Sequence, residues 1–254
     1  MSKRAVRRAK RRRQQQIRRI LTISLVTVGA VLVAFALIYP SIKPVGGIAA
    51  ITPNPRPMAE ANAMGDPNAP IKIEEFSDFQ CPACQHFFMQ TEKQVIDTYV
   101  ATGKVYFIYR SMGNFIGDNI EQSTGVPNSE SRDAAEAAYC ASEQNKFWEY
   151  HDILFANHTG EGAGDFIPRR LTAYAETLGL DMAAFRGCLG SDKYLQQVEQ
   201  DFEDGAAAGV DTTPSFLITY TVNGETKQKL IKGSYPFSQY QQEIEAALAE
   251  MGQQ

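Results

Sequence analysis

Acidic side chains are absent from residues 1–19, which contain ten lysines and arginines, and residues 20–39 contain no charged side chain of either sign. The formal net charge of −4 therefore combines a charge of +10 in this basic tail with −14 in the rest of the chain. Strong compositional bias is also absent, since 44% of the 254 residues are hydrophobic and only 19 are glycine and 12 proline. This composition excludes a disordered, collagen-like or coiled-coil protein and predicts a folded domain with its own hydrophobic core.

The uncharged run of residues 20–39 has the length and composition of a membrane-spanning helix. Twenty residues at a rise of about 1.5 Å each cover about 30 Å, the hydrocarbon thickness of a bilayer. A cleaved signal peptide is an alternative, but it would have a shorter apolar region followed by a small-x-small site. A buried core helix is a second alternative, and no amphipathic pattern supports it. We therefore expect a transmembrane signal anchor over residues 20–40, which ends at Tyr39-Pro40.

The basic tail sets the expected orientation of this anchor. Lysines and arginines beside a membrane helix stay on the cytoplasmic side, so residues 1–19 are predicted to be cytoplasmic and the chain after Pro40 to be extracytoplasmic. Attraction to anionic lipid head groups explains the tail better than a nucleic-acid role does, because the tail directly precedes the apolar run. The expected location is a cell membrane that the chain crosses once.

A linker and one α/β domain are predicted for the rest of the chain. Residues 41–67 contain five prolines and no sustained periodicity, which is typical of a partly extended linker. Residues 68–254 are predicted to form the domain, in the order β-α-β, then a helical block, then β-β-α. The strands are expected at 71–76, 104–109, 215–220 and 227–231, the last two joined at Asn223-Gly224, with helices at 82–100, within 129–208 and at 237–251.

The chain has four cysteines but lacks a second Cys-x-x-Cys pair, and its three histidines do not form a ligand pair at helical spacing. A zinc site needs two further nitrogen or sulfur ligands, so we expect no metal. Pro82 after Cys81 suits the first turn of a helix, whose free N–H groups stabilise a thiolate. The pattern predicts a redox dithiol in which Cys81 attacks and Cys84 resolves, with a purely structural Cys81–Cys84 disulfide as the alternative.

The second pair of cysteines, Cys140 and Cys188, lies 48 positions apart within the predicted helical block. In a domain outside the cytoplasm this spacing favours a structural disulfide, worth about 2–4 kcal/mol. Two buried free thiols and a second redox centre remain as alternatives.

Four segments together resemble the DsbA-like thiol–disulfide oxidoreductases, which have a thioredoxin fold. They are Gly65–Cys84 with its Cys-Pro-Ala-Cys motif, Phe147–Phe155 (FWEYHDILF), Leu178–Asp181 (LGLD) and Gly209–Leu217 (GVDTTPSFL). The sequence is most similar to the membrane-anchored subgroup with a second cysteine pair. The resemblance implies an α/β thioredoxin fold with a helical insertion at about 118–208, preceded by one transmembrane helix.

The resemblance also implies roles for three residues outside the cysteine pairs. Thr213-Pro214 matches the family's cis-proline, so Thr213 is expected to offer backbone groups to an extended substrate segment. Glu75 matches the buried acid that moves protons to and from Cys84, although the adjacent Glu74 competes for this assignment. Ala83 departs from the histidine of the best-known members and offers no side-chain stabilisation to the thiolate.

The expected function is the introduction of disulfides into exported proteins through Cys81 and Cys84. A reductase or isomerase of extracytoplasmic disulfides is the alternative within the same chemistry, and a tethered binding or chaperone module with an inert disulfide is the alternative from another class. The resemblance implies thiol-containing exported substrates and reoxidation by a membrane quinone-linked partner of the DsbB or VKOR type. Neither an organic cofactor nor a nucleic-acid partner is expected.

Overall fold

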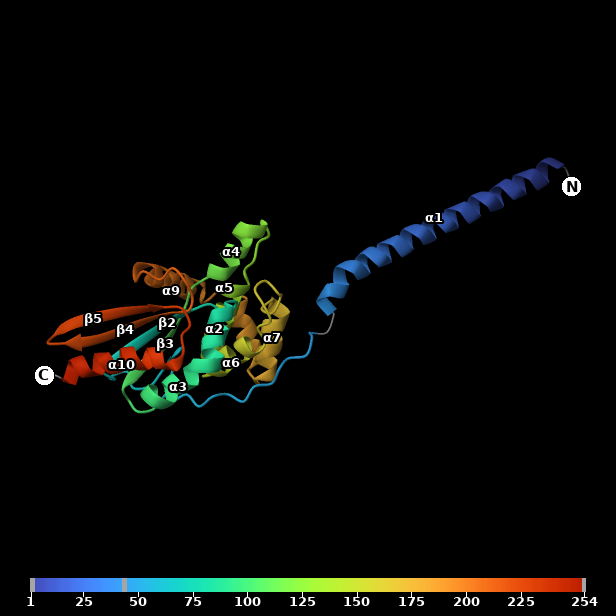
Figure 1. The fold of residues 1–254 in the computed structure, drawn as a ribbon. Coiled ribbons are helices and arrows are strands. Elements are labelled where there is room, and N and C mark those ends of the chain that lie inside the picture. The colour runs from blue at the N-terminus through green and yellow to red at the C-terminus, as the bar shows by residue number, and fades with distance from the viewer. Residues whose placement is uncertain (1–2, 43–44, 253–254) are drawn as a thin grey trace. The chain divides into compact units, whose positions relative to one another are not determined.

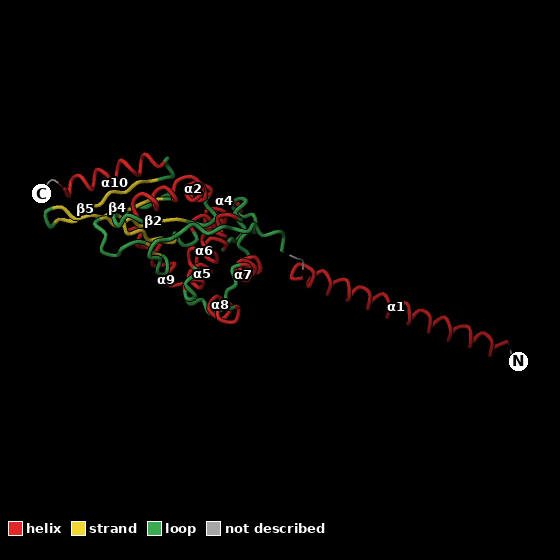
Figure 2. The backbone as a smooth tube through the Cα atoms, turned by 90° about the horizontal axis from the view of Figure 1, so that it is seen from below, coloured by secondary structure: helices red, strands yellow, loops and turns green. Residues whose placement is uncertain are grey.

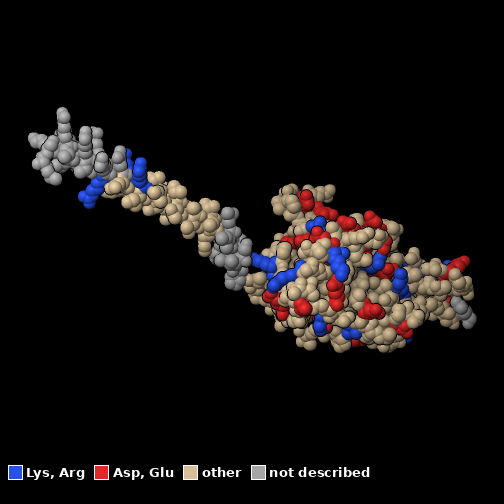
Figure 3. Space-filling model, turned by 180° about the vertical axis from the view of Figure 1, so that it is seen from behind, with Lys and Arg blue, Asp and Glu red and all other residues tan. Residues whose placement is uncertain are grey.

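A computed structural model describes residues 3–42 and 45–252, in two units that divide after Gly46. The first unit contains helix α1 (Lys3–Ile42), drawn in blue in Figure 1. Within the described residues, one segment, Gln16–Ala36, is long and apolar enough to cross a membrane. Figure 3 shows blue basic side chains at one end of this helix, followed by a run of uncharged ones. The helix continues past Tyr39-Pro40, where we had predicted its end, and it also includes most of the basic tail.

The second unit is built on a five-stranded sheet with the order β1-β3-β2-β4-β5. β2 and β3 pair in parallel, and all other neighbouring strands of the sheet are antiparallel. Four of the five strands match the predicted β-α-β and β-β units, whereas the two-residue β1 was not predicted. The strands are β1 (Ala63–Met64), β2 (Ile71–Ser77), β3 (Val105–Ser111), β4 (Ser215–Val222) and β5 (Glu225–Lys232).

Helices cover both faces of the sheet (Figures 1 and 2). One face is covered by α10 (Phe237–Gly252) and by a long helix that begins as α2 (Pro82–Phe87). That helix continues through a π-helical turn η1 (Phe88–Glu92), α3 (Lys93–Val95) and a second π-helical turn η2 (Ile96–Val100). The opposite face of β3 is covered by α9 (Leu195–Ala207).

Six helices lie between β3 and β4, where the sequence predicted a helical insertion at about 118–208. They are α4 (Phe115–Thr124), α5 (Glu130–Ser142), α6 (Phe147–Ala156), α7 (Pro168–Thr177), α8 (Met182–Leu189) and α9. A disulfide between Cys140 of α5 and Cys188 of α8 joins two of them, with their Cα atoms 5.8 Å apart. The insertion therefore carries its own covalent connection within a mainly aromatic and alanine-rich core.

Residues 47–62, which we call the strap, pack on the folded domain instead of forming a free linker. The backbone of Ala49 exchanges two hydrogen bonds with the side chain of Asn157, at 2.8 and 3.1 Å. Farther along, the guanidinium of Arg56 is buried against Glu92 and Asp152. The predicted boundary at residue 68 therefore differs from the structure, in which the compact unit begins at Gly47. A segment without periodicity can still be ordered when a few of its polar groups have buried partners.

Candidate active site

Cys81 lies at the N-terminus of the long helix, directly after the loop that follows β2. Its backbone is extended, with φ −80° and ψ 119°, and Pro82 occupies the first helical turn. The Cys81 carbonyl accepts the N–H of Gln85 at 3.1 Å, so the helix is already formed behind it. The free N–H groups of this first turn and the helix dipole face the sulfur, an arrangement that favours an anion.

The two thiols of the pair have opposite proton affinities. The thiol hydrogen bond from Cys84, together with the backbone N–H groups of Cys84 and Ala83, lowers the pKa of Cys81 to about 7. Burial raises the pKa of Cys84 well above its ordinary value, and its side chain is fully shielded from solvent. Cys81 is therefore suited to be the attacking thiolate, and Cys84 needs a proton when it leaves a disulfide.

The Thr213–Pro214 peptide bond is cis and lies beside the attacking sulfur. The Cys81 thiol donates to the Thr213 carbonyl at 3.4 Å. Directly after Pro214, Ser215 begins β4 in register with Phe76 at the end of β2. Pairing of β4 with β2 thus brings a segment from 132 residues away to the tip of the long helix.

Glu75 and Glu74 lie on opposite faces of β2, because side chains alternate along a strand. Glu75 is 1% exposed, and burial, followed by the negative charge of Glu92, raises its pKa to about 8. Glu74 instead lies partly exposed on the opposite face of the strand, where its carboxylate forms an ion pair with Lys72 at 2.8 Å. Of the two acids, Glu75 is the one in the interior beneath the cysteines, and its carboxyl is neutral over much of the physiological pH range.

Ser77 is a site residue that the sequence reasoning missed. It is fully buried, and its hydroxyl lies close enough to both Glu75 and Cys84 to lower the pKa of each, without meeting ordinary hydrogen-bond geometry to either. The two-residue alternation of a strand could have identified Ser77, because Ile73, Glu75 and Ser77 lie on the same face of β2. The hydroxyl is thus a buried polar group close to both the acid and the buried thiol.

The helical insertion holds the loop between β2 and Cys81. The buried side chain of Gln80 donates to Ser131 at 2.9 Å and accepts from the N–H of Gly162 at 2.9 Å. The carboxylate of Asp78 accepts the N–H of Ile116 at 3.0 Å. These contacts fix the position of Cys81 relative to the insertion.

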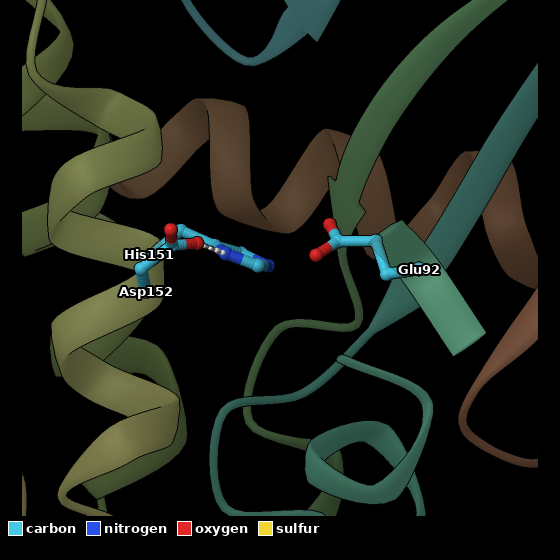
Figure 4. A group of neighbouring side chains, drawn as sticks. All are labelled: Glu92, His151 and Asp152. Carbon is cyan, nitrogen blue, oxygen red and sulfur yellow. Dashed lines mark hydrogen bonds and ion pairs between the residues drawn. The ribbon is translucent and has the colours of Figure 1, made fainter. Parts of the chain in front are cut away.

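A buried group of charged residues, not foreseen from the sequence, lies next to the long helix (Figure 4). Glu92 comes from η1, and His151 and Asp152 from α6, with ligand-type atoms within 4.8 Å of one another. Such spacing would also suit a metal ion, but Nη2 of Arg56 contacts Glu92 Oε2 at 3.0 Å and Asp152 Oδ1 at 2.6 Å. The guanidinium supplies the positive charge of this group, which we call the buried ion cluster.

Comparison with known proteins gives a consistent family assignment. A thioredoxin family model matches residues 59–232. The chain is 32% identical over 154 residues to the Na(+)/H(+) antiporter NhaA 3 of Salinispora tropica, covering 61% of this chain and 21% of that protein. It is 25% identical over 159 residues to the probable disulfide bond formation protein D of Bacillus anthracis, covering 61% and 68% of the two chains. The match thus spans only about a fifth of the length of the antiporter.

The fold is also shared with solved structures. Alpha-DsbA1 of Wolbachia pipientis superposes with a TM-score of 0.62 at 18% identity, covering 77% of this chain and 94% of that chain. The family model spans β2, both residues of the Cys81–Cys84 pair, the insertion and the Thr213–Pro214 bond. The chain therefore belongs to the thioredoxin family and has the DsbA-like form of its fold.

Proposed function

We propose that the protein is a thiol–disulfide oxidoreductase that introduces disulfides into exported proteins through Cys81 and Cys84. The observation that carries this proposal is the asymmetry of the pair, in which one thiol has a lowered pKa at a helix N-terminus and the other is buried. A stabilised Cys81 thiolate stabilises the reduced enzyme, and this favours transfer of the disulfide to a substrate.

The exchange proceeds in two steps that conserve electrons. A substrate thiolate attacks the Cys81 sulfur of the oxidised pair, the Cys81–Cys84 bond breaks, and Cys84 leaves with the electron pair and takes up a proton. A second substrate thiolate then attacks the substrate sulfur of the mixed disulfide and releases the Cys81 thiolate. Two substrate thiols become a disulfide, and the enzyme disulfide becomes a dithiol.

Glu75 is the proposed donor of the proton that Cys84 needs. Its raised pKa keeps the carboxyl protonated near neutral pH, and Ser77 lies close to both groups. Thr213 is proposed to bind the substrate, because its backbone is positioned beside the Cys81 sulfur. An extended peptide that paired with this backbone would bring its own sulfur to Cys81.

The proposed location is the outer face of a cell membrane, with α1 as a single-pass anchor and its basic end in the cytoplasm. The apolar segment Gln16–Ala36 and the arginines before it support this topology. The Cys140–Cys188 disulfide is compatible with an oxidising compartment. Reoxidation by a membrane quinone-linked partner of the DsbB or VKOR type completes the proposal.

Two measurements on the full chain in detergent test the activity and its direction. In Cys84→Ala, the Cys81 thiolate should attack disulfides of added proteins, release one protein thiolate and accumulate as a mixed disulfide, because no resolving thiol remains. The matched Cys81→Ala control should form none. Absence of adducts from both variants would favour a binding module with an inert disulfide. The reduction potential should lie on the oxidising side, nearer DsbA at about −120 mV than thioredoxin at about −270 mV. A potential as reducing as that of thioredoxin would instead support a reductase.

A further inference from the structure

A hollow of about 370 Å³ lies between helices of the insertion, within the size range of small-molecule sites. Helices α5, α7 and α8, which Figure 2 labels, contact one another around it. The hollow is lined by Asp133 and Glu136 of α5, Pro168, Leu171 and Thr172 of α7, Arg186 and Leu189 of α8, and Gly190 and Asp192, which follow α8. None of these is a residue of the candidate active site.

Two of the helices around this hollow are joined covalently. Cys140 lies one turn after Glu136 on α5, Cys188 directly precedes Leu189 on α8, and the two cysteines form the structural disulfide. The apolar part of the lining includes the fully buried Leu171 and the partly buried Leu189. A site whose walls are fixed before a ligand arrives loses less entropy on binding, so the hollow is suited to hold a small molecule.

Glu136 is the buried carboxylate of this lining. Its side chain is 7% exposed, and among the described residues its one ion-pair partner is Arg132, whose Nε lies 3.9 Å from Oε1. This distance is beyond hydrogen-bond range, and no other group in the described part of the chain donates a hydrogen bond to the carboxylate. Its oxygens are not sealed from solvent, unlike the unpaired oxygens of Glu75 and Glu92. The Glu136 carboxylate therefore faces the hollow without a hydrogen-bond partner.

The charges that act on Glu136 are mainly negative. Burial, followed by the charges of Asp192 and Asp133, raises the pKa of Glu136 to about 7, and Glu199 of α9 acts in the same direction. A cation in the hollow would relieve this repulsion and hold the carboxylate ionised.

The two nearby arginines do not fill this role. The Arg132 side chain is 42% exposed, and its Nη2 lies 3.6 Å from Asp133 Oδ1. Arg186, the one cation among the described lining residues, forms an ion pair with Glu176 at 2.6 Å. Both guanidinium groups are thus shared with carboxylates other than Glu136.

The spacing of the acids does not suit a metal ion. Among the described residues, the ligand-type atoms of Asp133, Glu136 and Asp192 do not all lie within 4.8 Å of one another. A calcium ion takes about six to eight oxygen ligands at about 2.3–2.6 Å. The hollow is instead large enough for an organic cation, and its apolar wall suits a carbon chain attached to the charged group.

We propose that this hollow binds a primary ammonium group on a short apolar chain, with Glu136 as its counter-ion. The ammonium donates hydrogen bonds to the carboxylate, and the chain packs on Leu171 and Leu189. A lysine side chain and a free alkylamine share this chemistry. The site is independent of the proposed redox function, because its lining contains neither Cys81 nor Cys84.

The test is the binding of n-butylamine to the full chain in non-ionic detergent at pH 8, measured by saturation-transfer NMR on the ligand signals. n-Butanol has a similar shape without the charge and should bind at least about tenfold more weakly. Glu136→Gln should weaken the binding of n-butylamine by a similar factor. The matched control Glu121→Gln, on the exposed surface of α4, should leave it unchanged. Equal binding of the amine and the alcohol to the wild type, or equal binding of the amine to the wild type and Glu136→Gln, would overturn the proposal.

The pH dependence of binding provides a second readout. n-Butylamine stays protonated between pH 6 and pH 8, whereas Glu136 titrates near pH 7, so the affinity should fall about tenfold from pH 8 to pH 6. Glu136→Gln should abolish this dependence. A wild-type affinity that does not change over this range would contradict the assignment of Glu136 as the counter-ion.

A blocked lysine distinguishes the two sources of the ammonium group. If Nα-acetyl-lysine methylamide binds at least as tightly as n-butylamine, the hollow accepts a lysine side chain of another protein. If it binds at least about tenfold more weakly, the hollow excludes the peptide groups, and the ligand is a free amine. Both results support the ammonium site, whereas the absence of saturable binding by either compound would overturn it.

Discussion

The two cysteine pairs of this protein are almost equally buried, yet their surroundings are opposite. Cys81 and Cys84 are 5% and 0% exposed, and Cys140 and Cys188 are 2% and 7% exposed. Cys81 faces the positive end of a helix, whereas the sulfur of Cys188 lies 3.8 Å from a carboxylate oxygen of Glu143. A helix N-terminus stabilises a thiolate and a neighbouring carboxylate destabilises it. Local charge, more than exposure, therefore distinguishes the Cys81–Cys84 pair, for which we propose redox activity, from the Cys140–Cys188 disulfide.

The largest expected effect is the loss of catalysis on removal of the attacking sulfur. Cys81→Ser should reduce the oxidation of a thiol-containing model protein to the uncatalysed rate, because no other described thiol combines a lowered pKa with a helix N-terminus. The double variant Cys140→Ser/Cys188→Ser is the control and should retain the wild-type rate within about twofold. Equal losses in both variants would break the distinction between the pairs.

The second pair should instead determine stability. Removal of the Cys140–Cys188 bridge, which closes a loop of 48 residues, should reduce the free energy of unfolding by about 2–4 kcal/mol. Denaturant unfolding followed by circular dichroism measures this, with Cys84→Ser as the matched control. An unchanged midpoint would mean that the bridge does not restrain the insertion.

A pH effect on stability should arise beneath the reactive pair. The pKa of Glu75 is about 8 in the folded protein and 4.5 is its ordinary value, so the folded state binds the additional proton between these values. The contribution of the Glu75 carboxyl to the free energy of unfolding is therefore fully present below about pH 4.5 and is lost as pH rises through 8. The loss amounts to a few kcal/mol. Glu75→Gln should remove this part of the pH dependence. Compared with the wild type, the unfolding midpoint of the variant should therefore be more favourable at pH 8 than at pH 5. A variant less stable than the wild type at pH 8 would show that the carboxyl is not destabilising there.

The smallest effect is expected at Glu143. The hydrogen bond from Lys193 lowers the pKa of Glu143, so its carboxylate stays ionised beside Cys188. Glu143→Gln should increase the rate at which a dithiol opens the Cys140–Cys188 disulfide, by about two- to fivefold for an exposed charge. Mass spectrometry after alkylation follows the opening, with Glu149→Gln as a matched control. A slower opening would mean that the carboxylate does not protect this pair.

Much of the fold followed from the sequence because hydrophobic periodicity and turn residues are local signals. The alternation in β2 and β3, the Asn223-Gly224 hairpin and the Cys-Pro-x-Cys helix start all depend on neighbouring residues. The strap did not follow, because its order depends on single long-range contacts such as that of Arg56. Glu92 was missed for a related reason: an acid in a helix is normally exposed. Only a counter-charge from a segment 36 residues away makes its burial tolerable.

The position of the helical insertion gives the site an order of assembly during synthesis. Both cysteines of the pair are made with β2 and the start of the long helix, but the Thr213 carbonyl that contacts Cys81 follows Cys81 by 132 residues. Until β4 arrives, β2 lacks one of its two neighbours and leaves a strand edge unpaired. A chain truncated before Thr213 would therefore contain both cysteines but not the Thr213 backbone that contacts Cys81. We expect such a fragment to aggregate, because its β2 edge is unpaired. The proposed site is therefore assembled only when both segments, Cys81–Cys84 and Thr213–Pro214, are present.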